Sequence, residues 1–324
     1  MPRHRSHSTL AWLLAIAIAA LTAIGLGATA LGWPHYLELL SHFQVQYLAV
    51  SLVLLVTLLS FNRQLPFWLG LFCCVALAMP VVSWYVPDPG RSPEASDLRV
   101  LVANLNAKNQ RYELVSELVA QQEPDLAVFM EVDLDWQTQL DASIALPHTY
   151  REPTRSSAGV AIYSRYPLIA ARRSNPTPEH SVFTELEVKG ERLLLAVTHP
   201  LPPTNERWFR SRNRQLSRLA QDLQTTTGPT LLVGDFNATM WSPYYRRFAR
   251  QTNLQNARQG FGILPSWPTQ RSFKPISGPL ALLLSIPIDH CLHSTGLEVV
   301  NIELGGFTGS DHRPLIVDLA IAGA

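Results

Sequence analysis

Charged residues are almost absent from the first 86 residues of this 324-residue chain. That part holds three basic side chains, Arg3, Arg5 and Arg63, and one acid, Glu38, although the whole chain has 26 Lys and Arg. So little charge excludes an ordinary water-exposed surface for this part and is typical of membrane-spanning segments. The rest of the chain has the composition of a soluble domain, so the sequence divides into two regions of different kind.

Cysteine is also scarce. Cys73 and Cys74 are adjacent within an apolar run, and Cys291 stands alone. This pattern excludes a disulfide framework and leaves the redox compartment undetermined. The formal net charge is only +1, so the overall charge does not favour tight binding to a polyanion, which normally rests on many Lys and Arg contacts to phosphates.

Long apolar runs fill the first region, at about residues 10–33, 45–61 and 66–86. The first run is longer than the apolar core of a signal peptide and long enough to cross a bilayer of roughly 30 Å as a helix. We therefore expect residues 1–86 to be a membrane region with three transmembrane helices. Residues 34–46, which contain His35, Glu38 and His42, are expected to be a loop or an interfacial stretch.

The few basic residues of this region predict its orientation. If all three runs span the membrane, Arg3, Arg5 and Arg63 lie on one side of it. The positive-inside rule then places the N-terminus in the cytoplasm and the chain after residue 86 outside. We expect an integral protein of a bacterial inner membrane whose C-terminal region faces the periplasm. A cleaved or re-entrant first span would instead leave that region in the cytoplasm or release it.

The remaining chain begins with a linker and continues as an α/β domain. Residues 87–97 contain three prolines and no apolar periodicity, which is typical of a linker. From residue 98 to 324, strand-like runs alternate with helical stretches. Besides the strands described below, we expect a helix at about 111–121, a strand at 159–164, and a hairpin of residues 182–188 and 192–198.

Residues 205–224 predict a strongly amphipathic helix. Phe209, Leu216, Ala220 and Leu223 share one of its faces. The opposite face carries arginines, namely Arg207, Arg210, Arg214 and Arg218. This basic face is most simply solvated, and a contact with phosphate or lipid headgroups is the alternative.

Several strand-like runs end in polar residues that can bind a metal or a phosphate. Residues 100–106, 126–131, 193–199 and 231–237 are such runs, and their polar ends are Asn104, Asn106, Glu131, His199, Asp235 and Asn237. Two further polar clusters, Ile288-Asp289-His290 and Ser310-Asp311-His312, follow near the end of the chain. Because strand ends gather at the edge of a sheet, we expect these side chains to converge.

The residue types in these clusters indicate a class of chemistry. They include Asp, Glu, Asn and His but neither cysteine nor a serine in a nucleophile elbow, which argues against structural zinc and covalent acyl transfer. Hard oxygen ligands favour Mg²⁺, Mn²⁺ or Ca²⁺. Such an ion beside histidines suits phosphoester hydrolysis.

The residues of these motifs and their order along the chain are together more specific than any single motif. They are Leu98-Arg99-Val100-Leu101-Val102-Ala103-Asn104, Gln122-Glu123-Pro124-Asp125-Leu126 leading to Glu131, Gly159-Val160-Ala161-Ile162-Tyr163-Ser164, Thr198-His199, Gly234-Asp235-Phe236-Asn237, Ile288-Asp289-His290 and Ser310-Asp311-His312-Arg313-Pro314. From residue 98 to its end, the chain resembles the endonuclease/exonuclease/phosphatase superfamily, which includes DNase I. The resemblance implies a DNase I-like, four-layer α/β/β/α sandwich of two mixed β-sheets, preceded here by the three transmembrane helices.

The resemblance also implies a metal site. Glu131 would be the main ligand of Mg²⁺, or alternatively Mn²⁺, with Asn104, Asn106 and Asp311 near the ion. Some relatives have an acid where this chain has Asn106. An amide there favours a one-metal site.

Catalytic roles follow from the same resemblance. His312, oriented by Asp289, would act as a general base or as a phosphate-stabilising imidazolium. Asp235 and Asn237 would align the attacking water and hold the phosphate, and His199 would stabilise developing charge or assist the leaving group. Whether Asp235 or His312 takes the proton is left open by the sequence.

Two features near the end of the chain have alternative interpretations. Trp267 lies where related proteins place substrate-contacting loops, so it would touch a base or a lipid, or else serve in packing. Residues 279–287 form an apolar run too short to span a bilayer. We expect a buried strand there, and a membrane-dipping loop is the alternative.

These inferences predict a membrane-anchored, Mg²⁺-dependent phosphoesterase. Its partners would be a phosphoester substrate, either a nucleic acid or a phospholipid headgroup, and the membrane lipid around the N-terminal helices, with no obligate protein partner evident. The substrate stays open between a nuclease and a lipid or headgroup phosphodiesterase, because the loops rather than the catalytic set select it. The alternative from another class is a catalytically silent binding or scaffold module that retains the fold.

Overall fold

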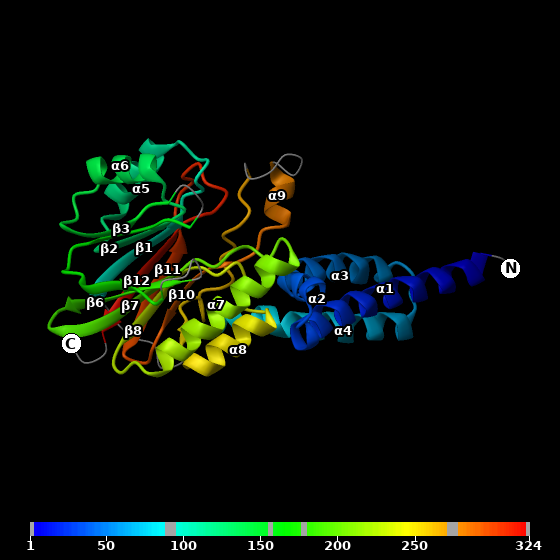
Figure 1. Ribbon diagram of the computed structural model, residues 1–324. Coiled ribbons are helices and arrows are strands. Elements are labelled where there is room, and N and C mark those ends of the chain that lie inside the picture. The colour runs from blue at the N-terminus through cyan, green and yellow to red at the C-terminus, as the bar shows by residue number, and fades with distance from the viewer. Residues whose placement is uncertain (1–2, 88–94, 155–157, 176–179, 271–277, 322–324) are drawn as a thin grey trace.

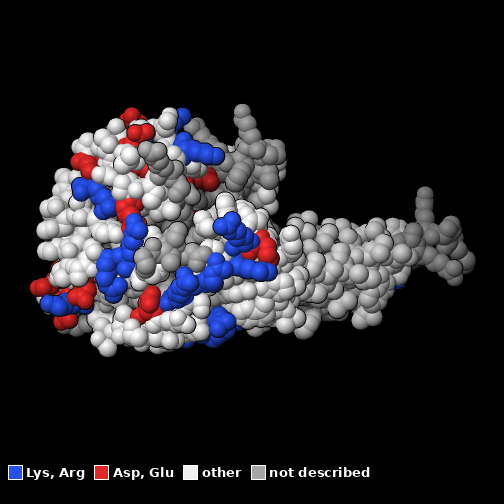
Figure 2. All heavy atoms as spheres, in the orientation of Figure 1, with Lys and Arg blue, Asp and Glu red and all other residues white. Residues whose placement is uncertain are grey.

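The computed structural model consists of a slender helical bundle joined to a two-sheet α/β sandwich (Figure 1). It describes residues 3–87, 95–154, 158–175, 180–270 and 278–321. Figure 2 shows charged side chains over the sandwich and almost none on the visible face of the bundle. The expected linker at 87–97 lies largely outside the described residues.

The bundle contains helices that are long and apolar enough to cross a membrane. Its elements are α1 (Arg3–Leu31), α2 (His35–Leu40), η1 (Ser41–Phe43), α3 (Gln44–Leu59), α4 (Gln64–Val82) and η2 (Ser83–Tyr85). The candidate spans are His7–Leu31, His35–Leu59 and Gln64–Tyr85. A 25-residue helix is about 37 Å long, which exceeds a hydrocarbon core of roughly 30 Å.

Small and aliphatic side chains fill the centre of the bundle. Ala11, Ala15 and Ile18 of α1 are buried against Leu55 and Leu58 of α3 and the cysteine pair of α4. Small side chains let helix backbones approach closely, which favours packing in lipid.

The expected loop or interfacial stretch at 34–46 is helical instead of a loop and begins the second candidate span. It forms α2 and η1, and its polar side chains are buried against the sandwich. His35 is 4% exposed, Glu38 is 0% exposed and His42 is 4% exposed. The reason is tertiary, because groups of the sandwich contact these side chains: His35 Nε2 is 2.6 Å from Pro203 O, Glu38 is 3.1 Å from Arg212, and His42 Nδ1 is 3.0 Å from Thr239 Oγ1.

The first sheet of the sandwich has the strand order β11-β12-β1-β2-β4-β3. Its strands are β1 (Leu98–Asn104), β2 (Leu126–Met130), β3 (His148–Glu152), β4 (Val160–Ser164), β11 (Leu297–Leu304) and β12 (Leu315–Ile321). β1 and β2 are parallel, and the other neighbours are antiparallel.

The second sheet has the order β5-β6-β7-β8-β10-β9. Its strands are β5 (Ile169–Arg173), β6 (Ser181–Val188), β7 (Glu191–Thr198), β8 (Thr230–Asp235), β9 (Gln255–Asn256) and β10 (Asp289–His293). The predicted hairpin is confirmed as β6 and β7, which turn at Lys189 and Gly190. β7 and β8 are parallel, so both sheets are mixed.

Helices cover the outer faces of both sheets (Figure 1). They are α5 (Tyr112–Gln122) and α6 (Leu134–Ser143) on the first sheet, and α7 (Glu206–Gln224) and α8 (Pro243–Thr252) on the second. One apolar core lies between the sheets, a second lies under α5 and α6, and a third lies under α7 and α8. This is the expected four-layer sandwich. Burial of each large aliphatic side chain in these cores contributes roughly 1.5–3 kcal/mol.

The expectation of a buried strand at 279–287 is wrong. Residues Pro279–Leu283 form a short helix, α9, and its leucines are exposed. Gly278, with φ of 75°, precedes Pro279 at the first helical turn, and proline at this position favours helix initiation. Within this run, strand-like pairing is limited to one bridge between Ile286 and Trp267 in the described part of the chain.

Candidate functional site

The ends of four strands bring polar side chains to one edge of the sandwich. Asn104 ends β1, and Glu131 directly follows the parallel strand β2. Asp235 ends β8, and His199 directly follows the parallel strand β7. Asp289 begins β10 opposite Asp235 in an antiparallel register. The sheet topology therefore gathers the predicted residues, as the strand-end pattern indicates.

Asn104 joins the two sheets at this edge. Its side-chain amide donates to Glu131 Oε1 at 3.1 Å and to Asp235 Oδ2 at 3.2 Å. The other oxygen of Glu131 accepts the Ala107 backbone N–H at 3.1 Å. One amide thus fixes two carboxylates from different sheets.

Backbone geometry at this edge is unusual. Gly234 has φ of 147°, and a Cβ there would lie 1.8 Å from the carbonyl oxygen of Thr198 on β7, so β8 approaches its neighbour too closely for any other residue. Glu131, Asn106 and Asn237 have positive φ values of 59°, 57° and 49°. Such left-handed residues cost about 1–3 kcal/mol each and concentrate at functional sites.

A buried His–Asp pair lies beside Asp235. His312 Nδ1–H donates to Asp289 Oδ2 at 2.8 Å, and His312 Nε2 is 3.7 Å from Asp235 Oδ2. Burial alone lowers the pKa of His312, but the carboxylates of Asp289 and Asp235 raise it to about 10. Although burial opposes it, the charge of His312 keeps the pKa of Asp289 below its ordinary value. The pair is an imidazolium–carboxylate ion pair.

Asp235 is in a different electrostatic position. Burial and the charge of Asp289 raise the pKa of Asp235 to about 8, against the opposing charge of His312. The carboxyl group is 1% exposed. Its pKa is therefore close to neutrality, where a carboxylate can exchange protons with substrate water.

His199 and Asn237 complete the surroundings of Asp235. His199 Nε2 is 3.6 Å from Asp235 Oδ2 and 3.9 Å from Glu131 Oε1. The Asn237 backbone N–H donates to Asp235 Oδ1 at 2.8 Å, and its side-chain amide donates to Pro200 O at 3.0 Å. Both residues lie within reach of a group bound at Asp235.

Asn106 and Asp311 meet at the rim of the site. The Asn106 side-chain amide donates to Asp311 Oδ1 at 2.7 Å, and the Trp267 indole N–H donates to Asp311 Oδ2 at 3.1 Å. The Trp267 ring centroid is 6.4 Å from that of His312. Trp267 thus orients an acidic residue of the site, which neither of its expected roles included.

Two buried residues that the sequence analysis did not select support the site from the side of the helical bundle. Arg212 of α7 donates to the Asn237 carbonyl oxygen at 2.8 Å and pairs with Glu38 of α2 at 3.1 Å. Both side chains of this ion pair are 0% exposed. The sequence does contain a signal that both residues are buried. Arg212 is spaced so that it shares a helix face with the apolar Phe209 and Leu216, and Glu38 is the single acid of the first 86 residues.

Arg258, which the sequence analysis did not select, lies with His290 beneath Asp289. Arg258 is fully buried, and burial lowers its pKa to about 10 against the opposing charge of Asp289. His290 donates from Nε2 to Ala238 O at 2.8 Å, and burial lowers its pKa to about 3. His290 is therefore neutral, whereas Arg258 adds positive charge behind Asp289. No pattern in the sequence marks Arg258.

The donor set fits a divalent cation. Glu131, Asp235, Asp289 and Asp311 place four carboxylates around two histidines. Hard oxygen donors with an excess of negative charge suit Mg²⁺ or Mn²⁺. Among the described residues, ligand atoms of Asp235, Asp289 and His312 lie within 4.8 Å of one another. Asp289 and His312 already bind each other, so the cluster around Glu131 fits the cation better.

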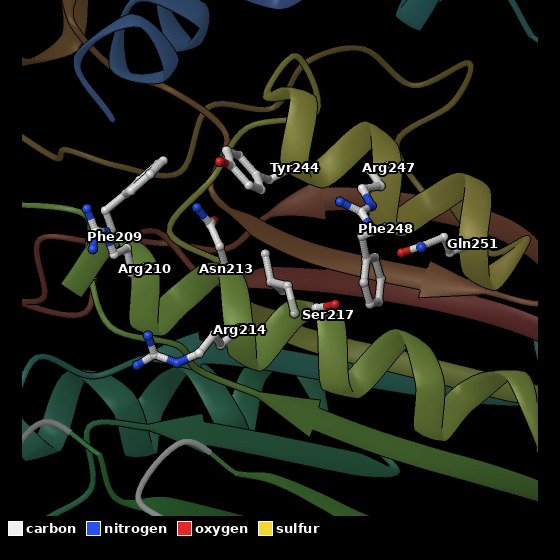
Figure 3. Close-up of a pocket in the computed structure, with 10 residues that line it drawn as sticks. Phe209, Arg210, Asn213, Arg214, Ser217, Tyr244, Arg247, Phe248 and Gln251 are labelled. Carbon is white, nitrogen blue, oxygen red and sulfur yellow. The ribbon is translucent and has the colours of Figure 1, made fainter. Parts of the chain in front are cut away.

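The predicted arginine face of α7 is exposed, as expected for a solvated face, and borders a separate cleft. Arg210 and Arg214 line this cleft of about 370 Å³ between α7 and α8, together with Tyr244, Arg247 and Phe248 (Figure 3). Arg210 also pairs with the exposed Glu206 at 2.8 Å. The cleft lies on the outer face of the second sheet and contains none of the predicted catalytic residues.

Solved structures show the same fold at low sequence identity. An endonuclease/exonuclease/phosphatase from Beutenbergia cavernae is 18% identical, with a TM-score of 0.54, and the match covers 71% of this chain and 72% of that one. D. rerio TDP2, complexed with a single-strand DNA product, is 12% identical, with a TM-score of 0.58 and coverage of 68% and 98%. The human Nocturnin catalytic domain, with a bound sulfate anion, is 21% identical, with a TM-score of 0.54 and coverage of 70% and 94%.

Sequence comparison gives the family directly. No curated protein is significantly similar to the chain. The family model described as "Endonuclease/Exonuclease/phosphatase family" matches residues 101–312, which include every predicted catalytic and metal-binding residue. Members of this family are hydrolases of phosphoester bonds and generally use divalent metals. The chain therefore belongs to the endonuclease/exonuclease/phosphatase family.

Proposed function

We propose that this protein is a membrane-anchored phosphoesterase that depends on a divalent cation, Mg²⁺ in the first place. The observation that carries the proposal is the convergence of Asn104, Glu131, Asp235 and the His312–Asp289 pair within one hydrogen-bonded cluster. Residues 98–324 would be the catalytic domain, and residues 1–86 would be its anchor.

The charge of each side chain indicates its role in the proposed reaction. His312 is an imidazolium held by Asp289, so its Nε2–H would donate to a phosphoryl oxygen and stabilise charge there. Asp235, whose pKa is close to neutrality, would accept the proton of the attacking water at Oδ2. The structure thus favours Asp235 as the proton acceptor, the point that the sequence left open.

The neighbouring amides and the second histidine position the phosphoester. Asn237 would donate to the phosphoryl group, because its side chain borders Asp235. His199 would stabilise charge near the leaving group between Asp235 and Glu131. Glu131, with Asn104, Asn106 and Asp311 around it, would hold the cation, which when bound neutralises charge on the phosphoryl oxygens.

The bundle supports an orientation for the domain. α1 starts at the end of the bundle far from the sandwich, and α4 ends next to the sandwich (Figure 1). Three spans therefore place the N-terminus and the catalytic domain on opposite sides. With Arg3, Arg5 and Arg63 on the N-terminal side, the domain would face the periplasm of a bacterial cell.

Hydrolysis of bis-p-nitrophenyl phosphate by the purified full-length protein tests this function. We expect activity with Mg²⁺, loss of activity on chelation, and a decrease of at least about 100-fold in Asp235→Asn and His312→Gln. Asp222→Asn, which changes an exposed acid at the far end of α7, is the matched control and should leave the rate unchanged. A folded wild-type protein without activity, or activity that survives both site variants, would contradict the proposal.

A further inference from the structure

Helix α9 exposes a compact apolar surface. Leu280 is 64% exposed, Leu282 46%, Leu283 68% and Leu284 39%, whereas Ala281 is fully buried. The whole segment from residue 278 to 288 carries no charged residue. Clustered leucines on a protein surface mark a contact with another apolar phase or partner, because covering them is favourable.

Hydrogen bonds place α9 at the membrane boundary of the bundle. The side-chain amide of Gln46, in the first turn of α3, donates to Leu283 O and Ser285 O, both at 3.1 Å. α3 belongs to the second candidate span, His35–Leu59. Figure 1 shows α9 beside the sandwich-side end of the bundle. The leucines therefore lie beside the sandwich-side half of the second candidate span.

Exposed aromatic residues lie at the sandwich-side ends of the candidate spans (Figure 1). Trp33 is 41% exposed after α1, Tyr36 is 78% exposed in α2 and Tyr85 is 56% exposed at the end of η2. Trp and Tyr are enriched where membrane proteins cross the headgroup region. These aromatics indicate that the sandwich-side ends of the spans lie at a membrane surface, and Gln46 holds α9 against one of these spans. The apolar phase next to α9 would then be the bilayer that surrounds the spans.

A short path connects α9 with the catalytic centre. The chain leaving α9 reaches Ile286, whose carbonyl oxygen accepts the backbone N–H groups of Ser266 and Trp267 at 3.1 Å. Trp267 in turn donates to Asp311, and the same chain continues to Asp289. The leucines and the catalytic residues are therefore parts of one rim.

A cleft lies between α9 and the segment that carries Asp311 and His312. It has a volume of about 440 Å³ and is lined by Thr269, Gln270, Leu282, Phe307 and Arg313. Phe307, which is 40% exposed, and Leu282 form an apolar side of this cleft. The other lining side chains are polar. This combination suits an amphiphile whose apolar part stays in the membrane.

We propose that the α9 leucines insert into the bilayer surface and that the catalytic centre acts on the phosphoester of a membrane lipid. The choice of substrate rests on the proposed function, whereas the membrane contact does not. A nucleic acid is the less suitable substrate at this rim, because the uncharged α9 segment offers no cations to its phosphates.

Lipid quenching tests the membrane contact independently of activity. The full-length protein is placed in nanodiscs of phosphatidylethanolamine and phosphatidylglycerol, with an environment-sensitive fluorophore on Leu283→Cys. Leu134→Cys on α6, where the leucine is 59% exposed, is the matched control, and the three native cysteines are buried. We expect lipids spin-labelled near the headgroup to quench the label at 283 and not the label at 134. The membrane contact would be contradicted if the label at 283 were not quenched, or if it showed energy transfer between two copies of the protein instead.

Activity on two substrates tests the lipid assignment. Leu280→Asp and Leu283→Asp should lower hydrolysis of lipid phosphodiesters in vesicles by about tenfold or more, because the contact loses buried apolar area. Both variants should hydrolyse bis-p-nitrophenyl phosphate as the wild type does, and Leu134→Asp should change neither rate. Hydrolysis of plasmid DNA but not of lipid, at a rate insensitive to the leucines, would overturn the lipid assignment. A wild type inactive on every substrate would refute the proposed function and the lipid assignment, while quenching would still decide the membrane contact.

Discussion

At the scale of single residues, the state of His312 depends on Asp289. The 2.8 Å hydrogen bond from Nδ1 fixes the ring, and the neighbouring carboxylates raise its pKa to about 10. In the proposed mechanism, this imidazolium would stabilise charge, and the neighbouring carboxyl group of Asp235, whose pKa is near neutrality, would accept the proton. The surroundings of His312 and Asp235, and not their residue types alone, determine the charge that each side chain carries.

Replacing Asp289 by Asn tests this dependence. The amide removes the charge that stabilises the imidazolium, so the pKa of His312 should fall toward its ordinary value, and the rate should fall by about 100-fold or more. Histidine nitrogen shifts in isotopically labelled, chelated protein and the rate with Mg²⁺ are the two measurements. His290, which burial keeps neutral, serves as the internal reference. An unchanged pKa of His312 would contradict the assigned ion pair.

At the scale of elements, α2 lies at the start of the second candidate span and also packs into the sandwich. Glu38 accepts a hydrogen bond from Ser242 Oγ–H at 2.6 Å besides its contact with Arg212, and His42 contacts Thr239 Oγ1 at 3.0 Å. Arg212 then holds the Asn237 carbonyl oxygen. A polar network therefore connects the helical bundle with a residue of the site.

Glu38→Gln should destabilise this junction strongly. The change leaves the Arg212 charge buried without a counter-charge, which typically costs about 3–5 kcal/mol. We expect a lower unfolding temperature, faster hydrogen exchange in α2 and residues 237–242, and reduced activity. Glu185→Gln, which breaks the exposed pair with Arg192 on β6 and β7, is the matched control and should cost less than about 1 kcal/mol. Equal effects of the two variants would show that α2 is not coupled to the site.

At the scale of the whole molecule, the bundle and the sandwich act together in the proposed topology. The spans determine the side of the membrane, and the buried junction at α2 restricts how the sandwich can tilt. Through Gln46, the same bundle also positions α9 near the bilayer. The catalytic edge would consequently be held at the membrane surface instead of moving on a free tether.

Reporters at two positions test the topology. An alkaline phosphatase fused after Ala324 should be active, because that enzyme needs an oxidising exterior for its disulfides. A cysteine replacing Asn62, in the turn before Arg63, should be labelled only after the cytoplasmic face is opened. Labelling at position 62 from the exterior, or an inactive fusion with normal expression, would contradict three spans with a cytoplasmic N-terminus.

The sequence by itself determined the local features of this protein. Apolar runs predicted the helices that can span a membrane, because hydropathy and length are properties of the run itself. Strand-like runs with polar ends, in a family-specific order, indicated the sandwich and the residues at its edge. Asn104 and Glu131 could be expected to meet because parallel strands present their carboxyl ends together.

Only the tertiary structure decided which groups meet across the chain. Glu38 and Arg212 are far apart in sequence, and their pairing arises where α2 packs on α7. The apolar run at 279–287 predicted a buried strand, yet its leucines belong to the short helix α9, and Gln46 binds them beside the second candidate span. Such features depend on long-range packing and on the membrane boundary, and neither of these is encoded in the periodicity of a single segment.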